Sequence, residues 1–190
     1  MKILCINQSD VNGGAAIAAT RLAKGLERYY GVDVHFAVGE KAGADAQAYC
    51  TRTSRFQAIC EKLLDRMTNK LGLQYQCFPF STRAIRKCVR VLDPDIIYLR
   101  ATHGGYFSTP LIRELGQSAP LVWTLSDMWS FTGHCAHTLG DESWQHMKAV
   151  PGGRHVYPAI ALPTGRILLA QKRRLSAAVE QAGEAVMVTD

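Results

Sequence analysis

The sequence has no CxxC pair, no long apolar run and no signal-peptide pattern, and each absence excludes a class of protein. Its six cysteines stand singly, which argues against a disulfide-rich secreted fold and favours buried free thiols in a reducing compartment. No apolar run approaches the ~18 residues that a membrane-spanning helix needs. Because the first residues, MKILCIN, also lack the features of a secretory signal, we expect a cytoplasmic protein.

Prolines are few, at 7 among 190 residues, and 47% of the residues are hydrophobic against 20% charged. This composition excludes a disordered chain, a collagen and a coiled coil. The length suits one domain with one core, so residues 1–190 are expected to form a single domain. Lysine and arginine outnumber the acidic residues by 22 to 16, and the net charge of +6 favours an anionic partner such as a phosphate, a nucleic acid or a lipid headgroup.

Strands and helices alternate from the N-terminus. Residues 3–6 form a short apolar run typical of a buried parallel strand, and a polar loop containing Gly13 and Gly14 follows it. Apolar residues then recur at helical spacing from 15 to 30, and alternation over 32–38 predicts a second strand. The beginning of the chain therefore predicts a βαβ unit with a right-handed crossover.

The alternation continues along the rest of the chain. Further strands are expected at 95–99, at 121–125 and from 185 onwards, and further helices at 83–92, 109–115 and 165–181. Residues 40–53 are polar, and 129–163 lack periodicity, which is typical of a long loop near a binding surface. This order predicts an α/β fold, a Rossmann-like three-layer α/β/α domain with a mainly parallel sheet that binds ligands at the carboxyl ends of its strands. Because a strand begins just before the last residue, we expect the natural chain to continue past Asp190.

A longer helix is expected from Ser54, as its N-cap, to Leu71. One stripe of this helix is apolar, with Phe56, Ile59, Cys60, Leu63, Leu64, Met67 and Leu71. Such a stripe packs on a core or lies on a membrane surface. Charges of both signs on the opposite face favour packing on the core.

Three segments lie at or after predicted strands and carry polar residues and glycines: INQSDVNGGAA, PDIIYLRATHGGYF and PLVWTLSDMWSFTGHC. Together they resemble the N-terminal domain of family 4 glycosyltransferases, which are bacterial polysaccharide-type enzymes with the two-domain GT-B fold. The third segment is similar to the family pattern W-T-L-H-D-M-W-x-F-T-G-x-C at nearly every position. The resemblance covers nearly the whole chain in order and spacing.

The resemblance implies a function and a missing part. It implies a retaining transfer, without metal or other cofactor, of a sugar from a nucleotide-sugar donor to a glycan or lipid-linked acceptor. It also implies that the chain is the acceptor-side half of the GT-B fold. The C-terminal donor-binding domain, absent from this chain, would hold most of the nucleotide, so the chain alone is expected to be inactive.

The strand ends supply the candidate site residues. Gly13, Gly14 and Ala15 are expected to form a donor-phosphate loop whose N–H groups stabilise a diphosphate leaving group, the alternative being a simple turn. Ser126 stands where the family pattern has a histidine. Asp127 beside it either accepts a hydrogen bond from an acceptor hydroxyl or only caps a turn.

Several aromatic residues and histidines follow the same strand ends. His103 is expected to contact the acceptor or the sugar, with a merely solvated histidine as the alternative. Trp123 is expected in the core, whereas Trp129 either stacks on a sugar or covers the end of the sheet, and His134 is a second acceptor-side candidate. The histidines around Cys135 could bind zinc, but their spacing fits no established pattern, and we expect no metal.

Two basic clusters are present, one with Arg83, Arg86, Lys87 and Arg90 and the other with Lys172, Arg173 and Arg174. Both are expected to be solvated helix faces rather than anion sites. The expected partners are the sugar donor and the acceptor, with peripheral contact at the inner face of a membrane as an open possibility, and no nucleic acid. The alternative function is a stand-alone or degenerate Rossmann-like binding module without catalysis. A dinucleotide-binding oxidoreductase is disfavoured because the first loop lacks G-x-G-x-x-G spacing.

Overall fold

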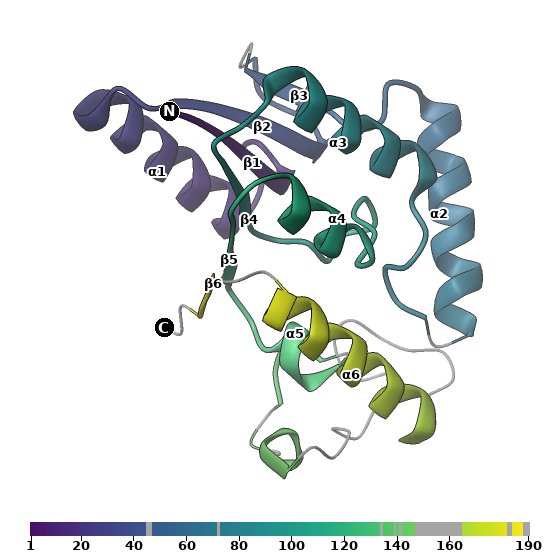
Figure 1. Ribbon diagram of the computed structural model, residues 1–190. Helices are drawn as coiled ribbons and strands as arrows, with labels where there is room; N and C mark the ends of the chain where they lie inside the picture. The colour runs from purple at the N-terminus through teal and green to yellow at the C-terminus, as the bar shows by residue number, and fades with distance from the viewer. Residues whose placement is uncertain are drawn as a thin grey trace.

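A six-stranded sheet with helices on both faces forms the protein (Figure 1). The computed structural model describes residues 1–44, 47–71, 73–133, 135–138, 140, 142–146, 165–181 and 184–187. The strand order is β3-β2-β1-β4-β5-β6, and every pairing is parallel. The prediction of a Rossmann-like α/β/α domain with a mainly parallel sheet is therefore confirmed.

The strands are β1 (Lys2–Ser9), β2 (Asp33–Glu40), β3 (Ala48–Cys50), β4 (Ile96–Leu99), β5 (Leu121–Leu125) and β6 (Glu184–Met187). The helices are α1 (Gly14–Tyr30), α2 (Arg55–Lys70), α3 (Pro79–Leu92), α4 (Leu111–Ser118), α5 (Trp129–Thr132), the 3₁₀ helix η1 (Ser143–His146) and α6 (Gly165–Gln181). Among the described residues, no helix has the length and apolar character needed to cross a membrane.

β1 lies in the middle of the sheet, between β2 and β4, and is buried on both faces. Leu4 and Ile6 belong to one hydrophobic cluster, while Ile3 and Cys5 belong to the other. This position explains why the strand is a continuous apolar run rather than an alternating one. All six cysteines are free thiols, and burial raises the pKa of the Cys5 thiol to about 12.

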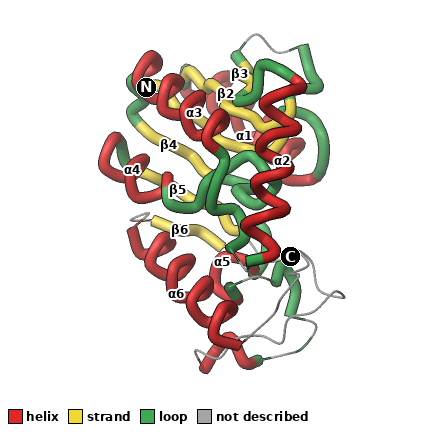
Figure 2. Tube along the Cα trace, turned by 90° about the vertical axis from the view of Figure 1, so that its right-hand side faces the viewer, coloured by secondary structure: helices red, strands yellow, loops and turns green. Residues whose placement is uncertain are grey.

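The helices divide between the two faces of the sheet, with α1 behind it and α2 and α3 in front of it in Figure 2. α1 packs through Ala16, Ala19 and Ala23 and ends at Gly31, which adopts the left-handed conformation with φ 62°. On the other face, α3 and α4 contribute to the larger cluster, which contains the buried Trp123 expected in the core.

Three short elements were not expected from the sequence. β3 lies within the polar stretch 40–53, and α5 and η1 lie within the segment 129–163 that lacks periodicity. Elements of three or four residues are too short to show a periodic pattern. The helix expected from 83 begins instead at Pro79, a residue whose fixed φ suits the first helical position.

The prediction that α2 packs its apolar stripe on the core is wrong. Ser54 does cap the helix, since its Oγ accepts a hydrogen bond from the Gln57 N–H at 3.3 Å. The stripe, however, faces solvent: Phe56 is 69% exposed and Leu63 57% exposed. The only fully buried residue of α2 is Glu61, whose carboxylate accepts hydrogen bonds from the N–H and Oγ of Ser81, both at 2.7 Å. This contact with the first turn of α3 turns Glu61 inward and leaves the apolar stripe facing solvent.

Candidate functional site

The candidate site lies along one edge of the sheet. Because all pairings are parallel, the carboxyl ends of β1, β4 and β5 meet at the same edge. The segments that follow these strands carry Gly13 and Gly14, His103, and Ser126 and Asp127, respectively. The structure thus brings the three sequence segments to one side of the molecule, which the parallel fold required.

His103 and Asp127 form a close pair at this edge. The His103 Nε2 lies 3.0 Å from the Asp127 Oδ2, and the two side chains are 15% and 16% exposed. The other carboxylate oxygen, Oδ1, accepts a hydrogen bond from the Trp129 N–H at 2.9 Å. Both oxygens of Asp127 therefore have protein partners, and the carboxylate fixes the orientation of the histidine ring.

The environment of Asp127 favours its ionised form. Burial acts to raise the pKa of this carboxyl, but the hydrogen bond and charge of His103 and the hydrogen bond from Trp129 outweigh burial, so the pKa lies below its ordinary value. A smaller charge contribution from His137 acts in the same direction. Asp127 is therefore a carboxylate at neutral pH.

Trp129 supports the histidine from one side. Its ring stacks on His103, with ring centroids 5.7 Å apart and an interplanar angle of 25°. The indole Nε1 donates a hydrogen bond to the Gln74 Oε1 at 3.2 Å, and the residue is buried. Trp129 is thus buried beside His103, and its contact with an acceptor sugar stays a prediction.

Tyr75 completes this frame and carries a strained backbone. Its ring meets Trp129 edge-on at 5.3 Å and lies 6.4 Å from the ring of His103. Its φ of 53° is in the left-handed region, and its carbonyl accepts hydrogen bonds from both the N–H and the Oγ1 of Thr109. No local pattern indicated Tyr75 or Gln74, because their role depends on contacts with residues far away in the sequence.

Ser126 is exposed and lies beside a different group. Its Oγ accepts a hydrogen bond from the Arg100 Nη2 at 3.4 Å, and the Arg100 Nη1 donates to the Tyr98 Oη at 3.0 Å. Ser126 therefore neighbours the pair in sequence but is held by the guanidinium at the end of β4.

The glycine loop opens α1 without a side-chain cap. Gly13 has a φ of 89°, which favours glycine, and it precedes the first helical residue, Gly14. A Cβ atom added at either glycine would meet nothing within 4 Å. The first turn of the helix, which includes Ala15, therefore begins beside open space.

The histidine-rich segment is only partly described. His134 and His155 lie outside the described residues. Cys135 is buried, and its N–H donates to the Oγ1 of Thr132 at 3.0 Å. Within the described part of the chain, no group of three or more metal-binding side chains gathers, and the expectation of no metal stays a prediction.

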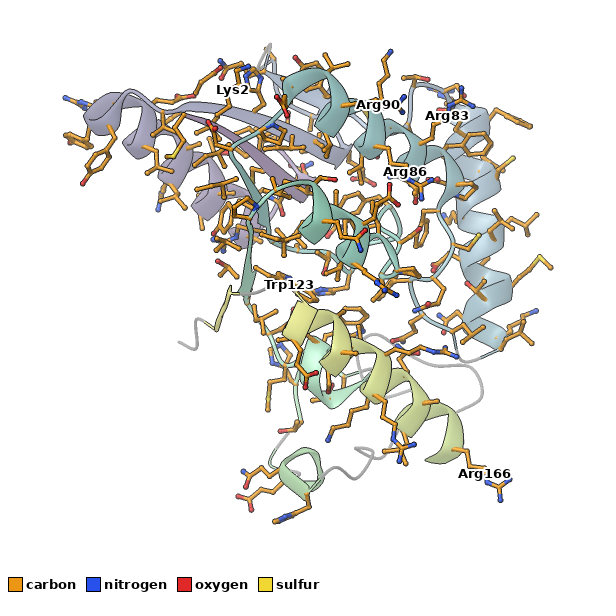
Figure 3. All side chains as sticks on the ribbon, in the orientation of Figure 1. Lys2, Arg83, Arg86, Arg90, Trp123 and Arg166 are labelled. Carbon is orange, nitrogen blue, oxygen red and sulfur yellow. The ribbon has the colours of Figure 1, made fainter. Side chains whose placement is uncertain are left out.

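The basic clusters divide into paired, buried and exposed residues. Figure 3 shows Arg83, Arg86 and Arg90 along α3. Arg86 makes two hydrogen bonds to Glu114, both at 2.7 Å. The expectation of a solvated face is wrong for Lys172, which is buried where α6 packs on Gly133 next to α5, and burial lowers its pKa.

Comparison with known proteins places these features in context. No protein-family model matches the chain. WcaC of Escherichia coli strain K12, whose name assigns it to colanic acid biosynthesis as a glycosyl transferase, is 27% identical over 92% of this chain. The chain is related to glycosyltransferases. It spans 45% of the length of WcaC, about half of the relative that it matches.

A solved structure is similar over the whole chain. The glycosyltransferase SnogD from Streptomyces nogalater covers 100% of this chain with 44% of its own, at a TM-score of 0.40 and 15% sequence identity. A similarity this low has no bearing on substrates or on individual site residues.

Proposed function

We propose that this chain is the N-terminal, acceptor-side domain of a retaining family 4 glycosyltransferase with the GT-B fold. The enzyme moves a sugar from a nucleotide-sugar donor to a glycan or lipid-linked acceptor, and a second domain outside this chain holds most of the nucleotide. One observation carries the proposal: the Gly13–Gly14 loop and the His103–Asp127 pair lie at the same carboxyl edge of the sheet. The sequence relation to WcaC supports it.

His103 is the proposed contact to the reacting sugars. Its side chain is 15% exposed, and its ring is held by Asp127 and Trp129. A fixed imidazole can hydrogen-bond a hydroxyl of the donor sugar or of the acceptor. Since both oxygens of Asp127 already have partners, Asp127 acts as a positioning residue rather than as a direct contact.

The loop at the start of α1 is proposed to face the donor diphosphate. Breaking the bond between the sugar and the diphosphate leaves negative charge on the phosphate oxygens. The N–H groups at the first turn of α1, which has no side-chain cap, are oriented to stabilise that charge. The proposal assigns this role to the backbone of Gly13, Gly14 and Ala15 and requires no metal.

An NMR titration of the ¹⁵N-labelled protein with nucleoside diphosphates tests the proposal. We expect the amide signals of Gly13, Gly14 and Ala15 to shift with a diphosphate and to stay unchanged with the corresponding nucleoside. A His103→Ala variant should still show the diphosphate-induced shifts of this loop. With a nucleotide sugar, it should lose the additional shifts that the wild type shows near the end of β4. A folded protein in which diphosphates shift no signal of this edge would contradict the proposal and favour a binding module of another kind.

Peripheral contact with a membrane belongs to the same proposal. The exposed stripe of α2 consists of Phe56, Ile59, Leu63, Met67 and Leu71. The cations Arg55, Lys62, Arg66 and Lys70 of the same helix are also exposed, and α2 and α3 lie on the same side of the molecule (Figure 2). Apolar side chains mixed with cations on an exposed helix are typical of helices that bind anionic bilayer surfaces.

A further inference from the structure

A cavity of about 800 Å³ lies at the loop that follows β4, and neither His103 nor Asp127 lines it. Gly104 and Gly105, which follow His103, line it, as does Tyr75, whose ring contacts the histidine. Ala58, Lys62 and Asp65 of α2 also line it. The volume is in the range of small-molecule sites, roughly 300–1,000 Å³, and is sufficient for more than one sugar unit.

Two cations lining the cavity are held by backbone carbonyls rather than by carboxylates. Arg52 donates hydrogen bonds from Nη2 to the Gly39 carbonyl at 2.8 Å and from Nη1 to the Gly105 carbonyl at 3.2 Å. The Lys41 Nζ donates to the Ala48 carbonyl at 2.8 Å. A carbonyl satisfies the N–H donor but leaves the positive charge in place. Within the described part of the chain, no ion pair involves either residue.

The remaining charged residues of the cavity balance one another, so its excess of positive charge equals that of Arg52 and Lys41. Arg55 and Lys62 contribute two more cations from α2, whereas the acidic residues are Glu40 and Asp65. Glu40 is exposed to solvent at the end of β2. Burial raises the pKa of the Asp65 carboxyl.

We propose that this cavity binds the acceptor of the transfer through an anionic group, either a phosphate ester or the carboxylate of a uronic acid. The inference rests on the proposed function, because it takes the carboxyl edge of the sheet, next to this cavity, as the place of reaction. Arg52, fixed between the ends of β2 and the loop after β4, holds the anion at the floor of the cavity. Lys62 and Arg55 contact it from α2. A neutral sugar would add no counter-charge to the four cations of the cavity, which outnumber its two acidic residues.

Three sugars that differ in charge distinguish the sources of the anion. The ¹⁵N-labelled protein is titrated with glucose 1-phosphate, glucuronic acid and glucose, while the amide signals of Thr53, Gly104 and Gly105 are observed. We expect shifts with one or both anionic sugars and none with glucose at the same concentration. Comparison of the two anionic sugars shows whether phosphate or carboxylate is preferred.

Matched variants on one helix show whether the cations of the cavity are responsible. Lys62→Gln should lower the affinity for the preferred anionic sugar about tenfold, as expected for loss of one charge-assisted hydrogen bond. Arg66→Gln removes an equally exposed charge one turn away that does not line the cavity, and should leave the affinity unchanged. Thermal unfolding of both variants checks that the fold is retained.

Equal binding of glucose, equal effects of Lys62→Gln and Arg66→Gln, or no shift with either anionic sugar would overturn the inference. The proposed function is judged separately, by the shifts of the Gly13–Gly14 loop with nucleoside diphosphates. If diphosphates shift the loop but anionic sugars do not bind in the cavity, only the inference about the acceptor fails. If anionic sugars bind but diphosphates shift nothing, the proposed function fails.

Discussion

Asp127 holds His103 with one carboxylate oxygen and the Trp129 N–H with the other, so its charge is tied to the fold of the site. Its pKa is lower in the folded protein than the ordinary value that applies to the unfolded chain. Ionisation of Asp127 therefore contributes stability that is fully present above the unfolded-state pKa. That contribution is lost as the pH falls through the lower, folded-state pKa.

The variant Asp127→Asn should show this dependence. Near pH 7 we expect it to lower the free energy of unfolding by about 1–3 kcal/mol, as for loss of a hydrogen-bonded charged group. Below about pH 4, where the unfolded aspartate also protonates, the difference from the wild type should shrink. Urea denaturation between pH 3 and pH 8 measures it. Glu27→Gln on the exposed face of α1 is the control, and a difference that is independent of pH would contradict the argument.

Gly39 lies where β2 passes the buried ring of Tyr106. A Cβ atom at this position would lie 2.6 Å from the Tyr106 Cγ and 2.7 Å from its Cβ. Because Tyr106 is fully buried, we expect Gly39→Ala to destabilise the protein by about 1–3 kcal/mol. Gly25→Ala, in α1 with nothing within 4 Å, should instead stabilise it by about 0.5–1 kcal/mol. Thermal unfolding compares the two variants. If both substitutions raised or both lowered the stability, a close approach of Tyr106 to Gly39 would not explain the effect of Gly39→Ala.

The sequence could indicate single residues of the site but not how they are held. His103 and Asp127 follow apolar strands, and that local pattern predicts their edge of the sheet. Their pairing, and the contacts of Tyr75 and Gln74 with Trp129, join segments that are distant in the chain. The sequence could not indicate the cavity cations Arg52 and Lys41 for the same reason, because their carbonyl partners are brought next to them only by the fold.

At the level of whole elements, the long strands and helices follow their local patterns closely. β5 and α6 have the bounds that periodicity predicts. α2 has the predicted bounds but the opposite orientation, because its amphipathic pattern does not say which face meets the protein. The two hydrogen bonds that Ser81 donates to Glu61 orient the helix with Glu61 toward α3, so that the apolar stripe faces solvent.

Glu61→Ala tests how strongly this contact joins α2 to α3. The substitution leaves the Ser81 N–H and Oγ without their buried acceptor, and we expect a loss of about 3 kcal/mol in the free energy of unfolding. Glu61→Gln should lose less, because an amide retains one oxygen acceptor. Urea denaturation measures both variants against Glu180→Ala on the exposed side of α6. A neutral effect of Glu61→Ala would show that the orientation of α2 has another cause.

At the level of the whole molecule, the outward stripe of α2 and the cations around it form one surface. The exposed cations Arg83, Lys87 and Arg90 line a groove of about 560 Å³ between α3 and the start of α2, which extends the positive charge beyond α2. The net charge of +6 has the same sign. This surface is the expected membrane contact, and charge and apolar area should act together on it.

Sedimentation with lipid vesicles measures that contact. We expect the protein to bind vesicles containing phosphatidylglycerol and not vesicles of phosphatidylcholine alone. Replacing Leu63 and Met67 together with glutamate should weaken binding by at least about tenfold, since burial of each side chain contributes roughly 1.5–3 kcal/mol. Tyr29→Glu with Tyr30→Glu changes two residues of α1 that are even more exposed, and it should have no effect. A dimer in solution that the α2 variant dissociates would instead assign the stripe to a second copy.

Because β1 lies in the middle of the sheet, the rate at which Cys5 becomes accessible to a reagent reports how often the protein opens there. Cys5 is 1% exposed between β1's two neighbouring strands and α1, and its thiol hardly ionises, so an alkylating reagent can label it only after the structure around β1 opens. The half-buried Cys60 and Cys77 are accessible without such opening. Mass spectrometry of peptides after timed alkylation would therefore give, from one sample, the labelling rates of Cys60 and Cys77 at the surface and the much slower labelling rate of Cys5.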